Sequence, residues 1–373
     1  MYATLDRQAD QFDIIRERLE QQKARNEQRL NRSLTFFQGM IAQWNLLIAE
    51  WINNPNHPAL KSGAVEHANR EYIRRFPLRM SDMLQEALHS PQAYLLKIAE
   101  YEMSIGGRPQ VHFPTHPAWY RLIVNDPLRV EEELLFQEVV LDHCPSGSVP
   151  LRIADLGTGN GRLAFALSDM FSTVTFHPGV QYIGLDLEVP NLRDWLRLAK
   201  EKDIESAMHP LLADMVHLPM KTEGIDIIGT SSSLNLCAEY LQPLVLLEMM
   251  RCLKEDGEIL ITGPNENFSA EDYVKCTMAT NLEEYLLPWN MLEAHNLGQP
   301  GMNIDELSRN RCDFSYLKTD QICEAADSMG CKLIYITHWP RRGTTREIYS
   351  GIRFKVTAET KRRMQGGEQE LSS

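Results

Sequence analysis

Three glycines at alternate positions lie in the segment Asp155-Leu-Gly157-Thr-Gly159-Asn-Gly161, between a β-rich run and an amphipathic helical pattern. Glycines in such a turn allow positive φ angles and let a ligand approach the backbone closely. Asp155 adds a carboxylate two residues before the first glycine. A pyrophosphate docked on the following helix N-terminus would be repelled by that carboxylate, whereas a cationic cofactor without phosphate would be attracted. The turn therefore predicts a binding site for a cofactor of the second kind.

Two other interpretations of the turn compete with this one. A nicotinamide-type dinucleotide site has the pattern Gly-x-Gly-x-x-Gly, but here the third glycine comes one position early and Arg162 occupies its expected place. This spacing disfavours a dinucleotide. The other interpretation gives the turn no ligand, because glycines can also serve the close packing of a helix against a strand.

The chain after Pro150 alternates short β-rich runs with helical segments, which is typical of a parallel sheet covered by helices on both faces. In such a doubly wound α/β fold, ligands bind beyond the carboxyl ends of the strands. The residues with chemical functions should therefore meet at that edge of the sheet. We predict strands over residues 151–154, 181–185, 209–212, 225–229, 258–262, 332–337 and 348–356.

The first part of the chain has a helical pattern instead. Apolar residues from Leu30 to Trp51 recur in steps of four and three, a spacing that forms one stripe along a helix. We expect this stripe to pack within the chain or to mediate self-association as a homodimer. Further helices are predicted over residues 64–76, 80–89, 91–104 and 127–143.

These patterns divide the chain into two domains and a tail. We predict a helical domain over residues 1–125, which would serve oligomerisation or cover a substrate site. An α/β domain is predicted over residues 126–360, with an insertion at 268–314 that is long for the fold. Residues 361–373 are polar, and we expect them to be disordered.

Composition limits the classes of partner. The formal net charge is −13 and no long Lys/Arg run occurs, so we predict no nucleic-acid partner. The seven cysteines are odd in number and form no Cys-x-x-Cys pair, which indicates neither a disulfide framework nor a metal site. No apolar run is long enough for a signal peptide or a membrane span. We therefore expect a cytoplasmic protein that does not bind membranes.

From the turn onward the sequence resembles the class I S-adenosylmethionine-dependent methyltransferases, over about residues 130–358. The resemblance implies a seven-stranded sheet and S-adenosylmethionine, which carries a sulfonium and an ammonium group, as cofactor. The run Tyr182-Ile-Gly-Leu-Asp186 resembles the strand whose terminal acid binds the ribose hydroxyls in that family. Asp214 and Met215 match the acid that accepts from the adenine amino group and the residue that packs on the ring. The predicted cofactor-binding residues are Asp155, Gly157, Thr158, Gly159, Gly161, Asp186, Leu187, Asp214, Met215 and Ser231.

Methyl transfer is an in-line displacement on carbon, so alignment of acceptor, methyl group and sulfur can supply much of the catalysis. A general base helps when the acceptor is a hydroxyl or a protonated amine. The candidates beyond the strand ends are Asn235, Asn265 and, in the insertion, His295.

We expect the acceptor atom to be an oxygen or a nitrogen of a small molecule or a peptide. Ser231-Ser-Ser-Leu-Asn235 differs from the Asn/Asp-Pro-Pro-Tyr/Phe motif of enzymes that methylate the amino groups of adenine or cytosine. Two alternatives stay open. One is a cofactor-bound scaffold or protein-interaction module with little turnover. The other is aminopropyl transfer on the same fold, which is disfavoured because no acidic cluster follows the fourth strand.

Overall fold

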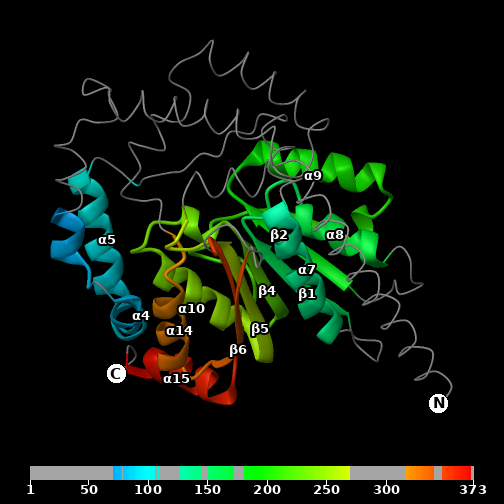
Figure 1. Ribbon diagram of the computed structural model, residues 1–373. Coiled ribbons are helices and arrows are strands. Elements are labelled where there is room, and N and C mark those ends of the chain that lie inside the picture. The colour runs from blue at the N-terminus through cyan, green and yellow to red at the C-terminus, as the bar shows by residue number, and fades with distance from the viewer. Residues whose placement is uncertain are drawn as a thin grey trace, which may run out of the picture.

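The computed structural model of the chain (Figure 1) is an α/β structure in which one sheet lies between two layers of helices. The predicted stripe from Leu30 to Trp51 lies outside the described residues, and so does the insertion apart from Phe268. The structure describes residues 70–77, 79–105, 108, 127–143, 150–171, 180–268, 316–339 and 347–370.

The sheet has seven strands in the order β3-β2-β1-β4-β5-β7-β6. Strands β1 to β5 run parallel to one another, whereas β7 is antiparallel to both β5 and β6. The predicted seven-stranded class I fold is confirmed, and the expectation of a parallel sheet is corrected at β7. The strands are β1 (Leu151–Leu156), β2 (Val180–Asp186), β3 (Met208–Leu212), β4 (Ile225–Ser231), β5 (Leu253–Pro264), β6 (Lys332–Trp339) and β7 (Tyr349–Lys355).

The strand order reverses between β1 and β4, because β2 and β3 continue on one side of β1 and β4 and β5 on the other. A ligand crevice forms outside the carboxyl ends of the strands at such a reversal. The glycine turn follows β1 directly, so the fold brings it to this crevice. The topology thus selects the region in which the predicted site residues can meet.

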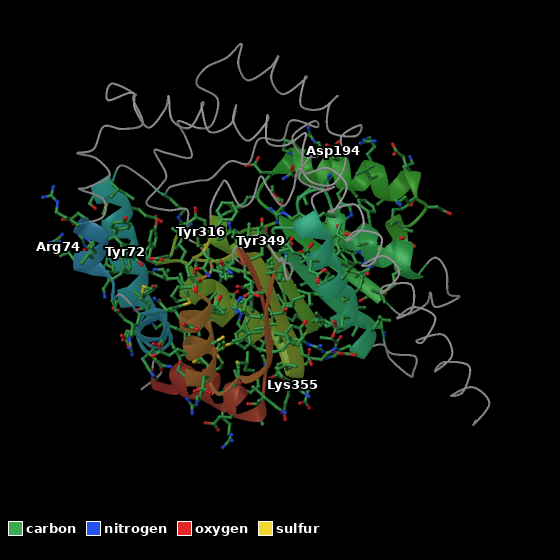
Figure 2. The ribbon with its side chains drawn as sticks, in the orientation of Figure 1. Tyr72, Arg74, Asp194, Tyr316, Tyr349 and Lys355 are labelled. Carbon is green, nitrogen blue, oxygen red and sulfur yellow. The ribbon has the colours of Figure 1, made fainter. Side chains whose placement is uncertain are left out.

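Helices cover both faces of the sheet, each around its own hydrophobic cluster. One face carries α7 (Pro127–Asp142), α8 (Arg162–Phe171) and α9 (Val189–Glu201). The other face carries α10 (Gln242–Cys252), α14 (Thr319–Ser328) and α15 (Ala358–Glu370). Two short 3-10 helices, η2 (Glu205–Ala207) and η3 (Leu234–Leu236), precede β3 and follow β4. Buried aromatic groups such as Tyr349 lie inside these layers, and charged groups such as Arg74 lie outside them (Figure 2).

Two helices from the predicted helical domain, α4 (Met80–His89) and α5 (Pro91–Ile105), pack on the α10 and α14 side. Their buried residues belong to the same hydrophobic cluster as α10 and α14. Tyr94 donates its hydroxyl to the Tyr240 carbonyl at 2.8 Å, and Phe76 stacks on the Tyr240 ring at 5.2 Å. The predicted helices over 80–89 and 91–104 are confirmed. The described part of the predicted helical domain therefore shares its core with the α/β part.

The C-terminal segment differs from the expectation of a disordered tail. Helix α15 extends from Ala358 to Glu370, so that expectation is wrong for residues 361–370. The Lys361 side chain is buried, and its ammonium group donates to the carbonyls of Met250 and Leu253 at the end of α10. A cation at a helix C-terminus satisfies carbonyls that lack helical partners. Polar composition alone does not reveal such a tertiary contact.

Candidate cofactor site

The glycine turn adopts the conformation that its sequence predicts. Gly157, Gly159 and Gly161 have φ angles of +72°, +59° and +86°, which favour glycine over residues with a side chain. A Cβ atom on Gly157 would lie 2.4 Å from the Ser233 hydroxyl oxygen, so the turn also needs glycine for space. The N–H groups of Gly157 and Thr158 donate to the Leu185 carbonyl at 2.8 and 2.9 Å. The turn is thereby fixed to the carboxyl end of β2.

Asp186 at the end of β2 reaches the glycine turn directly. Its carboxylate accepts hydrogen bonds from the N–H groups of Gly159 and Glu188, both at 2.8 Å. Burial raises the pKa of this carboxyl group, and the two backbone donors oppose that rise. Leu187, the next predicted cofactor residue, is exposed beside it. Two residues predicted from separate motifs, Gly159 and Asp186, are therefore in contact.

The segment after β3 lies beside the ends of β1 and β2, because the three strands are adjacent in the sheet. The Ala213 N–H donates to the Asp186 carbonyl at 3.2 Å, which joins this segment to the end of β2. The Asp214 carboxylate accepts the Val216 N–H at 3.0 Å and is partly exposed. The Met215 methyl group would lie 3.7 Å from a Cβ atom on Gly157. The residues predicted for adenine thus lie beside the glycine turn.

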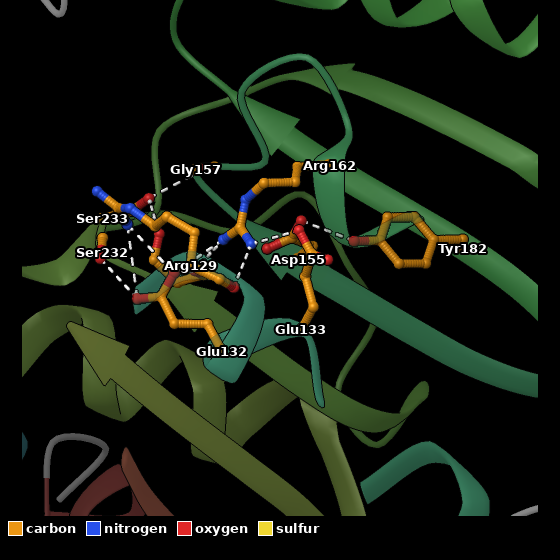
Figure 3. Close-up of polar contacts among 10 residues, drawn as sticks. Arg129, Glu132, Glu133, Asp155, Gly157, Arg162, Tyr182, Ser232 and Ser233 are labelled. Atoms are coloured by element: carbon orange, nitrogen blue, oxygen red, sulfur yellow. Dashed lines mark hydrogen bonds and ion pairs between the residues drawn. The ribbon is translucent and has the colours of Figure 1, made fainter. Parts of the chain in front are cut away.

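Asp155 lies in the interior behind the turn, because its residue is only 1% exposed. It accepts a hydrogen bond from the Tyr182 hydroxyl of the neighbouring strand at 2.7 Å (Figure 3). Burial raises its pKa to about 6, although the Tyr182 and Thr158 hydroxyls act in the opposite direction. The Asp155 carboxylate is therefore shielded from solvent and faces Tyr182.

Ser231 contacts a buried ionic network that the sequence interpretation missed. Figure 3 shows Glu132, Glu133 and Arg162 of this network. Glu132 of α7 accepts hydrogen bonds from the hydroxyls of Ser231 at 2.5 Å and Ser232 at 2.7 Å. Arg162 donates to Glu132, to Glu133 and to the Ser231 hydroxyl at 2.7 to 2.8 Å. The Ser231 side chain is thus engaged within the protein.

The charge state of this network follows from its geometry. Burial alone would raise the pKa of Glu132, but Arg129, Arg162 and the two serine hydroxyls together hold it below its ordinary value. Arg129 lies 3.2 Å from the Glu132 carboxylate and 5.8 Å from the centre of the Tyr349 ring. The network therefore holds ionised groups that balance one another, and it fixes the end of β4 to α7.

The backbone of Ser232, a residue of this network, has an unusual conformation. Ser232 has a φ angle of +51°, which is uncommon for a residue with a side chain and occurs often at functional sites. Its hydroxyl is held by Glu132 and its N–H donates to the Thr262 carbonyl at 2.7 Å. The available sequence signal was the presence of charged residues within the otherwise apolar pattern of the helix over 127–143.

The three predicted catalytic candidates have different surroundings. Asn235 on η3 is 2% exposed, and its Oδ1 atom has no hydrogen-bond partner among the described residues. Asn265 donates its amide to the Glu347 carbonyl at 3.1 Å and the Ser350 hydroxyl at 2.9 Å, so its side chain joins β5 to the β7 region. His295 lies outside the described residues. The catalytic roles of all three stay predictions, and hydrogen bonding gives Asn265 a structural role.

Two further observations concern the described residues. Within them, no group of three or more His, Cys, Asp or Glu side chains is arranged to hold a metal ion. Across the same residues, none of the helices combines the length and the apolar character that a membrane span requires.

Comparisons with known proteins gave one family match and distant similarities to solved structures. Residues 149–308 match the family model described as a methyltransferase domain. No curated protein matches the chain. Among solved structures, a SAM-dependent methyltransferase from Aquifex aeolicus is 14% identical, with 65% of this chain and 100% of that chain covered and a TM-score of 0.40.

Two other solved structures have similar values. The geranyl diphosphate C-methyltransferase from Streptomyces coelicolor is 14% identical, with 67% of this chain and 89% of that chain covered and a TM-score of 0.39. The N-methyltransferase NodS from Bradyrhizobium japonicum is 10% identical, with 62% and 97% covered and a TM-score of 0.38.

The sheet order and the glycine turn define an α/β protein of the class I methyltransferase type. Residues 149–308 match a methyltransferase domain within this fold, with no subfamily assigned.

Proposed function

We propose that the chain binds S-adenosylmethionine at the carboxyl ends of β1, β2 and β3 and transfers its methyl group to an oxygen or a nitrogen of a small molecule or a peptide. The observation that carries this proposal is the convergence of the glycine turn with Asp186, Asp214 and Met215. These residues come from motifs that are separate in the sequence. Their convergence is expected of a shared ligand site, and helix packing alone does not require it.

The donor chemistry of the site fits this cofactor. The carboxylates of Asp155, Asp186 and Asp214 lie around the turn and favour a ligand with sulfonium and ammonium charges. Each oxygen of a carboxylate accepts up to two hydrogen bonds. Oδ1 of Asp186 accepts the Glu188 N–H and, at 3.5 Å, the Asn191 amide, whereas Oδ2 accepts the Gly159 N–H and keeps capacity for a ribose hydroxyl. Asp214 would accept from the adenine amino group in the same way, and Met215 would pack on the ring.

When bound, the cofactor supplies a methyl group activated by the sulfonium. The chain's contribution would be mainly to hold the acceptor atom in line with that methyl group and to exclude water. Asn235 is the predicted catalytic residue whose buried amide oxygen has no hydrogen-bond partner among the described residues, so it could orient an acceptor group by accepting a hydrogen bond from it. Asn265 and His295 remain proposed members of the acceptor side. A homodimer through the N-terminal helices and a cytoplasmic location also stay proposals.

Binding of the cofactor is the first test. Calorimetry on the full chain should give micromolar affinity for S-adenosylmethionine, and Asp186→Ala should weaken it at least about tenfold, since a hydrogen bond to a charged acceptor is worth roughly 1.5–3 kcal/mol. Asp194→Ala is the matched control, because Asp194 is an exposed carboxylate of α9 that pairs with Arg197 at 3.6 Å. Equal affinity of the wild-type protein and Asp186→Ala would overturn the proposed site.

Turnover is a separate question. Incubation of the protein with labelled cofactor and fractionated small molecules or peptides should transfer label to an acceptor. If Asp186-dependent binding is found but no fraction becomes labelled, the scaffold interpretation replaces the enzymatic one.

A further inference from the structure

One contact links the N-terminal helices to the predicted adenine residue. Arg108, which follows α5, donates from Nε to the Glu102 carboxylate at 2.6 Å. Its Nη1 atom lies 3.5 Å from Oδ2 of Asp214. The side chains of Arg108 and Asp214 are 36% and 37% exposed, so the pair lies at the surface and is partly accessible to solvent.

Glu102 is itself anchored. Its carboxylate also accepts the Tyr240 hydroxyl at 3.2 Å. Tyr240 is buried, its ring packs on those of Phe76 and Tyr101, and its carbonyl accepts the Tyr94 hydroxyl. A rigid core therefore holds Glu102, Glu102 holds Arg108, and Arg108 faces Asp214. These contacts explain how Arg108, which lies outside the α/β region, is held beside the segment that follows β3.

The distances indicate which contact is the stronger one. A separation of 2.6 Å is a charge-assisted hydrogen bond, whereas 3.5 Å is an ion pair with weak hydrogen bonding. The Asp214 Oδ2 atom consequently keeps capacity for a better donor. Arg108 restrains that carboxylate by its charge while leaving it able to accept.

We propose that Arg108 is a positioning residue for the adenine end of the cofactor site, and that it acts by orienting the Asp214 carboxylate. This inference rests on the proposed function. It assigns a cofactor-related role to a residue of the N-terminal region, which lies outside the matched methyltransferase domain. It also makes the placement of α5 and the affinity for adenosine-containing ligands depend on each other.

The test measures affinity for three ligands that share adenosine: S-adenosylmethionine, S-adenosylhomocysteine and methylthioadenosine. Arg108→Ala should weaken all three by a similar factor of about two to five, the range expected of a partly exposed ion pair. Arg75→Ala is the matched control, because Arg75 forms an ion pair with Glu100 of α5 at 2.6 Å in the same helical region. That variant should bind all three ligands like the wild-type protein, and thermal unfolding should verify that both variants are folded.

A double-mutant cycle distinguishes positioning from a general structural effect. If Arg108 acts through Asp214, Arg108→Ala should have no further effect on affinity in an Asp214→Asn background. The inference is overturned if Arg108→Ala leaves the affinities unchanged, tightens them, spares methylthioadenosine, or has the same effect in both backgrounds. In those cases the wild-type protein still binds the cofactor and the proposed function stands. A wild-type protein that binds none of the three ligands overturns the proposed function, and this inference with it.

Discussion

Gly161 is the position at which a single methyl group should be most damaging to the site. Its φ angle is +86°, and a Cβ atom there would lie 2.3 Å from Cδ1 of Trp195. The Trp195 side chain belongs to α9, is fully buried, and lies against Gly184 of β2 on another side, where a Cβ atom would approach it to 2.4 Å. The indole therefore has little room to move away from residue 161.

The cost of Gly161→Ala has two parts. A left-handed conformation costs an alanine about 1–2 kcal/mol, and an extra methyl group in a well-packed interior costs about 1–3 kcal/mol. The loss of unfolded-state entropy returns only about 0.4–1 kcal/mol. The net free energy of unfolding should fall by roughly 1.5–4 kcal/mol, a large part of the 5–15 kcal/mol that is usual for a folded domain.

Urea unfolding of the full chain, followed by circular dichroism and tryptophan fluorescence, measures this change. Gly184→Ala is the matched control, because its Cβ would meet the same indole while its φ is not positive. That variant should lose the packing part, about 1–3 kcal/mol, less the same unfolded-state entropy of about 0.4–1 kcal/mol. A free energy of unfolding for Gly161→Ala within about 0.5 kcal/mol of the wild-type value, the usual span for substitutions that disturb nothing, would contradict both parts of the cost. Equal losses of unfolding free energy in the two variants would show that the left-handed conformation at residue 161 adds no cost.

Two further variants test the charges below the site. Glu132→Gln should lower the free energy of unfolding, measured in urea, by about 3 kcal/mol, because it leaves the charges of Arg129 and Arg162 partly uncompensated in the interior. The control is Glu201→Gln at an exposed position, which should change the free energy of unfolding by less than about 1 kcal/mol. Similar changes in the two variants would contradict the stabilising role of the network. For Asp155, burial raises the pKa from its ordinary 3.8 to about 6, so the folded state holds the proton more tightly and loses stability as the pH rises through that window. Asp155→Asn should therefore be more stable relative to the wild-type protein at pH 8 than at pH 4 in urea unfolding, and a pH-independent difference would contradict it.

The helices and strands, and most of the residues proposed for the site, could be predicted from the sequence. Glycine has no Cβ atom and adopts positive φ angles without help from tertiary contacts, so the turn after β1 could be predicted from its three glycines. Strands and helices followed from the spacing of apolar residues, which depends on near neighbours in the chain. Asp186 and Asp214 followed from their places at strand ends. The antiparallel course of β7 did not follow, because pairing direction is a property of the whole sheet.

Which charged groups come into contact depends on tertiary packing. Glu132 and Ser231 are 99 residues apart in sequence, and Arg108 and Asp214 are 106 apart, so local patterns carry no record of either contact. The same holds for Lys361, whose ammonium reaches the end of α10. Burial also decided the state of Asp155, because the sheet surrounds its carboxylate and Tyr182 occupies one side of it. The glycine turn identifies the kind of site, and long-range packing determines which side chains can act in it.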